Sequence, residues 1–358
     1  MMRGTRHMKI LVYGAGPLGS LMATRLIEAG HDVYVLARGQ RLSDLREHGI
    51  VLEYGTSGER SVTRANVVES LSSDDYYDLV MVVMRKNHAL QILPILAANT
   101  KVPTVLFMMN NAAGQEQLVE ALGEQRVMIG FPYPGGRRAG HVMHVLRADE
   151  RTKWTIPIGE VSGTITQRTR QVSEVLASMR GYNVEIRQDM DAWLKCHVAL
   201  LMPALCPALY ACGSSVERLC RTRDAMVLAV RGIKEAFRAL TKAGISITPP
   251  KLKMLLWLPE PVIVGLVRRA ASSPDLRLSA EGHAIAARDE MKHLTDEFLA
   301  YVSGVGAKTP VIDYLYRYFD PEAEHIPDGS AELPMNFGAV WVVFGFALCA
   351  LGFFYFIR

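Results

Sequence analysis

Short apolar runs alternate with a helix-like period through the first half of the chain. Lys9–Tyr13 is an apolar run that ends at a glycine, and residues 18–29 repeat apolar side chains at helical spacing before Gly30. Residues 33–37 form a second apolar run, so strand, tight turn, helix and strand follow within about thirty residues. Further strand-like runs cover residues 79–84, 104–109 and 154–159. The pattern predicts a βαβ unit that continues into a parallel sheet.

From about Asp191 the pattern changes to long segments with helical period. These segments cover residues 193–210, 225–243 and 281–302, and residues 311–318 close the helical part. Prolines and glycines separate them, and little of this region resembles a strand. We therefore expect a Rossmann-type α/β domain over residues 8–187, an all-α domain over residues 188–320, and an acidic linker over residues 321–335.

The end of the chain is apolar on every face. Residues 337–357 contain no charged side chain, and at about 1.5 Å per residue they would extend roughly 30 Å, the thickness of a bilayer core. The sequence predicts a transmembrane helix over residues 336–357, and the alternative is a buried C-terminal helix. Glycines at 338, 345 and 352 could line one packing face and favour a homodimer. Because no export signal precedes the fold, we expect a cytoplasmic body anchored to a membrane by a single C-terminal helix.

Bulk composition excludes several classes of function. Hydrophobic residues make up 49% of the 358 residues and the net charge is only +4, without a cluster of basic and aromatic residues that would bind nucleic acid. The five cysteines form no CxxC pair, so we expect free thiols and neither a disulfide framework nor a metal site. The composition is that of a folded protein with a small-molecule partner.

A glycine-rich turn follows the first predicted strand. The sequence VYGAGPLGS has GxGxxG spacing and opens a helix directly after a strand, the context in which this motif binds a dinucleotide. The glycines permit the tight turn, the approach of the pyrophosphate and the packing of the helix on the strand. The phosphates would bind at the helix N-terminus, where free N–H groups attract anions. We expect the cofactor to contact Gly14, Ala15, Gly16, Pro17, Leu18 and Gly19.

The end of the second predicted strand favours NADPH over NADH. A site for NAD has Asp or Glu there to bind the ribose hydroxyls, but this segment reads LARGQR. Arg38 could bind a 2′-phosphate through two hydrogen bonds, with Arg41 as a second cation. The alternative is that Arg38 is a solvated surface residue.

Several of these segments together resemble the ketopantoate reductase (2-dehydropantoate 2-reductase) family. The resemblance begins with KILVYGAGPLGS and LARGQR, and continues through DLVMVVMRKNHAL, NNAAGQEQL, WTIPIGE, IRQDMDAWLK and GAKTPVIDYLY. It covers most of residues 8–318. The resemblance implies reduction of a 2-oxo acid by NADPH, with a Rossmann domain followed by a helical domain.

The same resemblance implies roles for individual residues. Lys195 matches the lysine of the family's W-x-K helix and would donate a proton to the carbonyl oxygen as hydride arrives. Glu290 matches the family's glutamate and would hydrogen-bond the lysine or the substrate. Asn110 would orient the nicotinamide, and Arg85, where the family has a lysine, would face the cofactor or the substrate, as would the adjacent Lys86.

This chain also departs from the family's pattern. Ala199 and Pro203 stand where the family usually has asparagines, and Leu278 and Gly282 stand where it often has Ser and Asp. A site without those polar groups selects a polyhydroxylated substrate poorly. His197, His283, Arg137 and Arg138 are candidate replacements. Three hypotheses stay open: a reductase of ketopantoate in the pantothenate pathway, a reductase of a less polar 2-oxo acid, and a non-catalytic NADPH-binding membrane protein.

Overall fold

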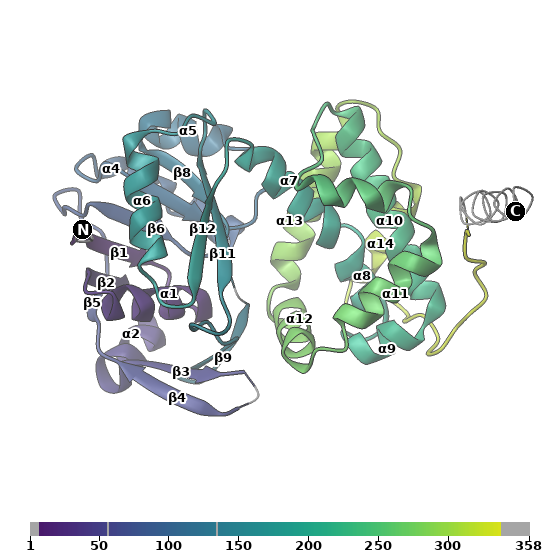
Figure 1. Ribbon diagram of the computed structural model, residues 1–358, viewed down its shortest axis with the longest axis horizontal. Helices are drawn as coiled ribbons and strands as arrows, with labels where there is room; N and C mark the ends of the chain where they lie inside the picture. Colours follow the sequence, from purple (N-terminus) through teal and green to yellow (C-terminus); the bar gives the residue numbers. More distant parts are fainter. Residues whose placement is uncertain (1–6, 56, 134, 338–358) are drawn as a thin grey trace, which may run out of the picture. The chain divides into compact units, whose positions relative to one another are not determined.

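The computed structural model describes residues 7–55, 57–133 and 135–337, which form two compact units (Figure 1). The first unit runs to Lys195 and also includes Leu278–Leu294. The second unit comprises Cys196–Arg277 and the residues from Thr295 onward. The chain therefore passes from one unit to the other three times, after Lys195, Arg277 and Leu294.

An eight-stranded sheet is the framework of the first unit. Its order is β12-β11-β8-β7-β6-β1-β2-β5, and all neighbours are parallel except β8 and β11. The six strands from β5 to β8 therefore have the order of a doubly wound Rossmann sheet, which confirms the fold predicted for this part. The strands are β1 (Lys9–Tyr13), β2 (Asp32–Leu36), β5 (Asn66–Val68), β6 (Leu79–Val82), β7 (Val105–Met108), β8 (Val127–Gly130), β11 (Trp154–Glu160) and β12 (Tyr182–Ile186).

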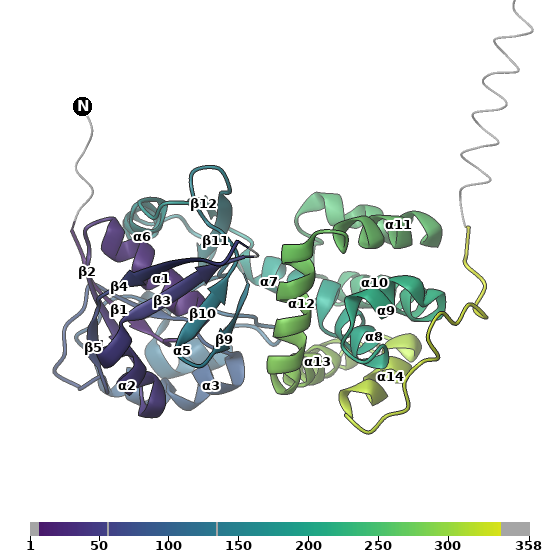
Figure 2. The ribbon, with the colours of Figure 1, turned by 90° about the horizontal axis from the view of Figure 1, so that it is seen from below.

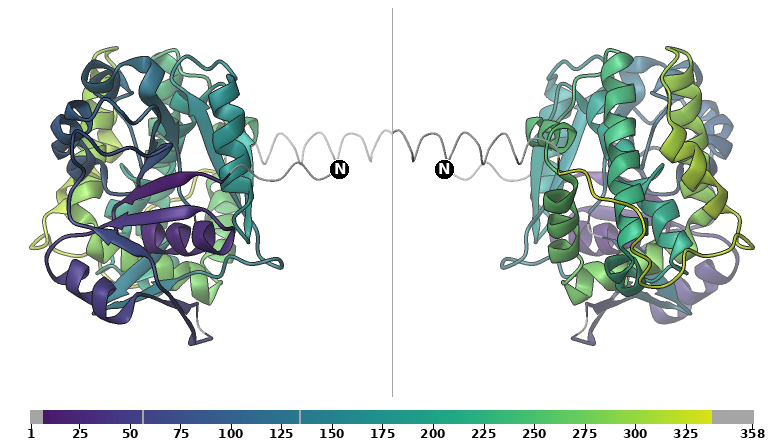
Figure 3. Two further views of the ribbon diagram at one scale, coloured as in Figure 1. Left: turned by 90° about the vertical axis from the view of Figure 1, so that its left-hand side faces the viewer. Right: turned by 90° about the vertical axis from the view of Figure 1, so that its right-hand side faces the viewer.

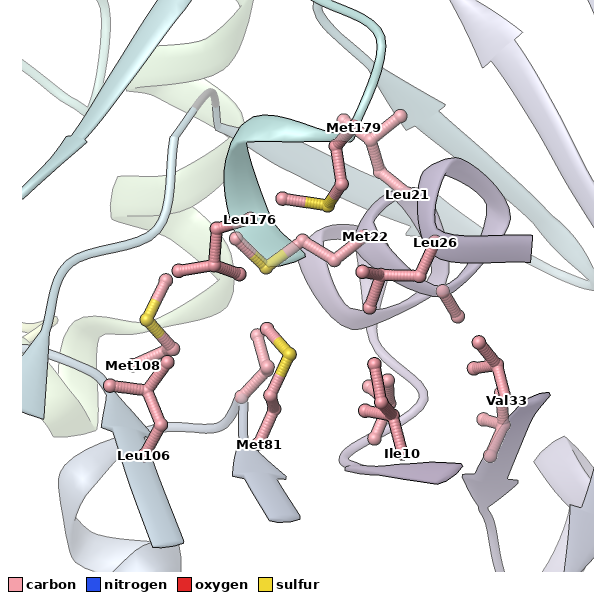
Figure 4. Close-up of a cluster of buried hydrophobic side chains, with 14 of the residues drawn as sticks. Ile10, Leu21, Met22, Leu26, Val33, Met81, Leu106, Met108, Leu176 and Met179 are labelled. Carbon is pink, nitrogen blue, oxygen red and sulfur yellow. The ribbon is translucent and has the colours of Figure 1, made fainter. Parts of the chain in front are cut away.

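Helices cover both faces of this sheet and bury two apolar clusters. On one face α1 (Pro17–Glu28) and α6 (Gln167–Ala177) contribute Leu21, Met22 and Leu176 to a core with Ile10 and Met81 (Figure 4). On the other face lie α3 (Lys86–Gln91), α4 (Leu93–Ala98) and α5 (Glu116–Leu122), followed by the 3-10 turn η1 (Glu124–Arg126). The strands between them are buried on both faces, so they read as continuous apolar runs.

A second, four-stranded sheet was not predicted. Its order is β4-β3-β10-β9, and it consists of β3 (Ile50–Tyr54), β4 (Glu59–Thr63), β9 (Gly136–Ala139) and β10 (Val142–Val145). Helix α1 contacts β3, β9 and β10 as well as β1 and β2, so it lies between the two sheets, and α2 (Gly39–His48) contacts β5 of the main sheet. The two edge strands, ERSVT and GRRA, contain few apolar side chains, so neither gives an apolar signal in the sequence.

The second unit is helical, as predicted. Helix α10 (Arg223–Lys242) is buried along most of its length and contacts helices on several sides. The other helices and turns that lie in or enter this unit are α7 (Met190–Leu201), α8 (Leu205–Ala211), α9 (Val216–Arg221), η2 (Pro250–Leu256), α11 (Glu260–Ala270), α12 (Pro274–Ala286), α13 (Arg288–Ser303), α14 (Pro310–Tyr316) and η3 (Arg317–Phe319).

Two of the predicted long helices are each interrupted. The segment 193–210 is divided between α7 and α8, with Pro203 in the break; proline lacks the N–H that the helix needs and its ring collides with the preceding turn. The break also lets α10 approach closely, because a Cβ on Gly232 would lie 2.6 Å from that of Ala204. The segment 281–302 is divided at Ala287 into α12 and α13, which leaves the Ala286 carbonyl free to accept a hydrogen bond from Arg85.

The acidic segment expected to be a linker is held along the second unit. The Asp224 carboxylate at the start of α10 accepts hydrogen bonds from the backbone N–H of Glu332, at 3.0 Å, and of Leu333, at 2.8 Å. Arg231 Nη2 donates to the carbonyl of Pro334 at 2.6 Å. Figure 3 (right) shows this segment in yellow, running along the helices to the last described residues.

The transmembrane helix predicted over residues 336–357 lies almost wholly outside the described residues. Within the described part of the chain, one stretch has the length and apolar composition needed to cross a membrane, Met190–Ala211. About two thirds (67%) of it is buried inside the protein. Buried core helices commonly have this composition, so this stretch is weak evidence for a membrane span.

Candidate functional site

The three glycines of the loop after β1 differ in the space that a side chain would find there. Gly14 has a φ of 127°, and a Cβ there would lie 2.3 Å from the carbonyl oxygen of Val83. A Cβ on Gly19 would lie 1.8 Å from the Gly14 carbonyl oxygen, so the helix can pack on the turn only without a side chain. A Cβ on Gly16, by contrast, has no protein atom within 4 Å. The space before the N-terminus of α1 is therefore open to a ligand.

The helix that starts in this loop suits an anion. Gly16 is its N-cap and Pro17 its first residue, and neither a side-chain cap nor an acidic residue occupies its first turn. Its first N–H groups have no acceptor within the helix and point toward the open space. Ala15 and Leu18 are partly buried against the core and fix the loop from behind.

Arg41 is buried and braces the glycine loop. Its buried guanidinium donates to the carbonyl of Ala15 at 3.0 Å, to Ser20 Oγ at 3.0 Å and to the carbonyl of His141 at 3.3 Å. Burial, and then the charge of Arg138, lower the pKa of Arg41 to about 10, so it remains charged at neutral pH. A contact between Arg41 and a 2′-phosphate stays a prediction.

Arg38 keeps the exposed position expected of it. It follows β2 as the N-cap of α2, and its Nη2 donates to the Tyr13 hydroxyl at 3.0 Å. Its Nε contacts the carbonyl of Glu69 at 3.4 Å. The Tyr13 contact orients the guanidinium at the carboxyl end of β1 and β2 while most of it faces solvent, where a ribose phosphate could reach it.

The loops after β1 and β6 meet at the point where the strand order reverses. The close approach of Gly14 to Val83 joins these two loops, and open α/β sheets bind ligands at such switch points. Arg85, in the β6 loop, is already engaged by protein: Nη1 contacts Asp289 Oδ1 at 2.9 Å, and Nη2 donates to the Ala286 carbonyl. Its contact with a cofactor stays a prediction.

Lys86, next to Arg85, is the buried cation of this loop. Its side chain is 1% exposed, and Nζ donates to Asn111 Oδ1 at 2.7 Å. Asn111 in turn donates to the Gly114 carbonyl at 2.6 Å, which holds the loop after β7. Of the two cations that follow β6, Lys86 is thus the one that fixes the neighbouring loop.

The structure brings Asn110 and Glu290 together. The buried carboxyl of Glu290, on α13, accepts hydrogen bonds from the Asn110 side chain and from the Lys86 backbone N–H. Burial raises the pKa of Glu290, opposed by the charge of Arg85 and by these hydrogen bonds. Asn110 Oδ1 is buried and has no hydrogen-bond partner among the described residues. A buried acceptor of this kind is rare unless a ligand or water completes it.

Lys195 is buried on α7 beside a carboxylate that was not predicted as part of the site. Its Nζ lies 2.5 Å from each carboxylate oxygen of Asp191, one helical turn earlier. Lys195 is 4% exposed, whereas the Asp191 side chain is 39% exposed. The i, i+4 spacing within DAWLK was the available signal for this pair. A contact between Lys195 and Glu290 stays a prediction.

The candidate replacements for the family's polar residues differ from one another. Arg138 pairs with Asp44 at 2.9 Å and belongs to the structure around α2. Arg137 packs its stem against α12, where a Cβ on Gly282 would lie 3.3 Å from Arg137 Cδ. A cavity of about 500 Å³, lined among others by Val302, Lys308 and Asp313, includes none of the predicted site residues.

A Rossmann sheet with an open glycine loop at its switch point, followed by a helical unit, defines the class of this chain. It is an α/β protein with the architecture of nucleotide-dependent oxidoreductases.

Comparison with known proteins shows which family the chain resembles. Residues 10–157 match the family model described as ketopantoate reductase PanE/ApbA. A 2-dehydropantoate 2-reductase of Mesorhizobium japonicum is 27% identical over 212 residues, which are 52% of this chain and 63% of that protein. The chain is therefore similar to the ketopantoate reductase family over its first unit, as its sequence motifs indicated. The match spans less than two thirds of that relative.

Solved structures share the fold at low identity. A 2-dehydropantoate 2-reductase from Geobacter metallireducens superposes with a TM-score of 0.71 at 15% identity, covering 88% of this chain and 99% of that one. D-mandelate dehydrogenase in a complex with NADH and anilino(oxo)acetate gives a TM-score of 0.70 at 14% identity, covering 87% and 97%. Both coverages extend the shared fold beyond the family match to the helical region.

Proposed function

We propose that this protein is an NADPH-dependent reductase of a 2-oxo acid, similar to 2-dehydropantoate 2-reductase. The observation that carries the proposal is the buried Asn110–Glu290 pair in the same unit as the open glycine loop. NADPH, when bound, supplies the hydride that reduces the carbonyl carbon. Gly14, Gly16 and Gly19 would admit the pyrophosphate, and Arg38 would bind the 2′-phosphate that distinguishes NADPH from NADH.

The residues proposed to act at the reacting carbonyl group have separate roles in positioning and in proton transfer. Asn110 Oδ1, buried and unpartnered within the described structure, would accept a hydrogen bond from the carboxamide of the cofactor or a hydroxyl of the substrate. Lys195 would donate a proton from its ammonium to the carbonyl oxygen as negative charge develops there. Glu290 would hold the donor and the substrate in place, and Asp191 would keep Lys195 ordered before substrate binds.

The helix that carries Lys195 bears on the choice of substrate. Ala199 and Pro203 are both buried and apolar, so neither side chain can bind a hydroxyl group. The leading substrate is ketopantoate, as the family suggests, and a less polar 2-oxo acid is the alternative that these two residues favour. A non-catalytic NADPH-binding protein is the remaining alternative.

Turnover of NADPH against a panel of 2-oxo acids tests the proposal. We expect loss of absorbance at the nicotinamide band with ketopantoate or with a bulkier, less polar 2-oxo acid, and the better substrate decides between them. Lys195→Met should lower kcat by about 10²–10⁴-fold, whereas Lys153→Met, at an exposed lysine paired with Glu150, should leave it unchanged. Tight NADPH binding without turnover across the panel would instead support the non-catalytic alternative.

We also infer that residues 336–357 anchor the protein to a membrane, with the described units in the cytoplasm. Support comes from the run of 21 residues without charge in the sequence, 337–357, which matches the thickness of a bilayer core. Flotation of the full chain with vesicles after an alkaline carbonate wash tests this. Release of the protein by that wash would argue against a membrane span.

A further inference from the structure

We propose that the outer side of η2 and α11 lies on the surface of a lipid bilayer that contains anionic lipids. This basic-apolar face is defined by four apolar residues, Met254, Trp257, Val262 and Leu266, and three basic ones, Lys251, Lys253 and Arg269. It belongs to the second unit and takes no part in the proposed reductase site.

The apolar residues of this face are unusually exposed for their size. Trp257 is 63% exposed, Leu266 53%, Met254 43% and Val262 42%. Val262 and Leu266 are four residues apart on α11 and therefore lie on one side of the helix, while the buried Ile263 and Val264 face the interior. A group of exposed apolar side chains with polar neighbours commonly marks a contact with a partner or a membrane.

The basic residues indicate what kind of partner covers the face. All three are exposed and lie on the same two elements as the apolar residues, with Lys251 and Lys253 on η2 and Arg269 on α11. Arg268 turns away from this face and donates to the Cys220 carbonyl at 2.8 Å. Aromatic and aliphatic side chains accompanied by lysine and arginine suit the interface of a bilayer with anionic head groups. A symmetric contact with a second copy would bring the same positive charges together, which is unfavourable.

The chain leaves the second unit beside this face. Glu260, the first residue of α11, donates its backbone N–H to the Asn336 carbonyl at 3.1 Å, and its carboxylate accepts from the Asn336 N–H at 2.8 Å. Arg231 of α10 fixes the same carboxylate through its Nε at 2.8 Å. The last described residues therefore end at the start of α11, as the yellow segment shows in Figure 2.

The sequence that follows makes lipid the expected occupant. Phe337 is 51% exposed, and residues 338–357 carry no charge. If that stretch enters a bilayer, its first residue is one or two positions from a backbone pair fixed to α11, so α11 must lie close to the membrane surface. The exposed Trp257 and Leu266 would then contact the head-group region, where such side chains are stable.

Quenching of Trp257 by brominated lipids tests this arrangement in the full chain. The protein is reconstituted into phosphatidylcholine–phosphatidylserine vesicles with and without bromine on the acyl chains near the head groups. Subtracting the emission of Trp257→Phe from that of the wild type isolates Trp257, and the same subtraction with Trp154→Phe, in β11 of the first unit, is the matched control. We expect at least twofold quenching of the Trp257 emission and none of the Trp154 emission.

Two outcomes would overturn the membrane contact, and a third would overturn the role of anionic lipid. One is unquenched Trp257 emission in protein that floats with the vesicles, which would mean that a second copy or the chain's own C-terminal segment covers the face. The other is failure of the full chain to float. The variant Lys251→Glu/Lys253→Glu, at two exposed sites, should reduce the quenching in vesicles with phosphatidylserine, and undiminished quenching there would refute the role of anionic lipid. Neither result depends on reductase activity.

Discussion

Alanine variants at Gly16 and Gly19 distinguish an effect on cofactor binding from an effect on stability. A Cβ on Gly16 would meet no protein atom within 4 Å, and its φ of −74° is accessible to alanine. The change gains roughly 0.4–1 kcal/mol from the unfolded chain and loses a similar amount because alanine is a poor N-cap. We therefore expect Gly16→Ala to unfold within a few degrees of the wild-type Tm.

The same methyl group would occupy the space that a pyrophosphate needs. Losing one hydrogen bond to a charged phosphate costs about 1.5–3 kcal/mol, which corresponds to a rise in the Kd for NADPH of roughly 10- to 150-fold. Gly19→Ala should behave differently, because its Cβ would lie 1.8 Å from a backbone oxygen. We expect that variant to lose about 3 kcal/mol or more of stability.

Two measurements check this pair of variants: the Tm from thermal unfolding, and the Kd from titration of NADPH fluorescence. Gly265→Ala, a helical glycine with equally open surroundings in the second unit, is the control and should keep the wild-type Kd. If Gly16→Ala folds normally and binds NADPH as tightly as the wild type, the glycine loop is not the phosphate site and the reasoning fails.

Three further predictions concern single charged residues of the site. The pKa of Glu290 is raised above its ordinary 4.5, so its contribution to stability is complete below that pH and declines as the pH rises. The Tm of Glu290→Gln should therefore increase relative to that of the wild type from pH 4.5 to 7. A difference in Tm that does not change with pH would contradict this. Arg38→Ala should raise the KM for NADPH by about 10- to 100-fold and leave the KM for NADH nearly unchanged. If steady-state kinetics show the same rise in KM for both cofactors, Arg38 does not contact the 2′-phosphate. Asp191→Asn should lower kcat by about tenfold and change KM by less than that. Asp189→Asn, at the Asp189–Arg187 ion pair, should alter neither kcat nor KM.

Much of the first unit could be predicted because its central strands are buried on both faces. Strands β1, β2, β6, β7 and β11 each stand out as apolar runs, and the loops after the first four contain Gly14, Arg38, Arg85 and Asn110. In an open α/β sheet the residues after parallel strands converge at one edge. The order of apolar runs along the chain is then enough to place these four residues at one edge of the sheet.

The four-stranded sheet and the buried charges lacked such a signal. Strand β3 pairs with β10, about ninety residues later, and the two edge strands contain few apolar side chains. Arg41 and Lys86 look like surface residues in the sequence, yet both are buried and bind backbone or amide oxygens. Periodicity cannot reveal a buried cation whose partner lies in a distant loop, so the contacts that Arg41 makes with the glycine loop were not predicted.

The discontinuous make-up of the first unit limits how this protein can be divided. Glu290 and Asp289 come from a stretch of seventeen residues that returns to the first unit after more than eighty residues of the second. A fragment ending at Lys195 would contain the glycine loop but would leave Arg85 and Asn110 without their acidic partners from α13. Neither unit can be exchanged by a single crossover between related genes, so the glycine loop and the acidic residue beside Asn110 are inherited together.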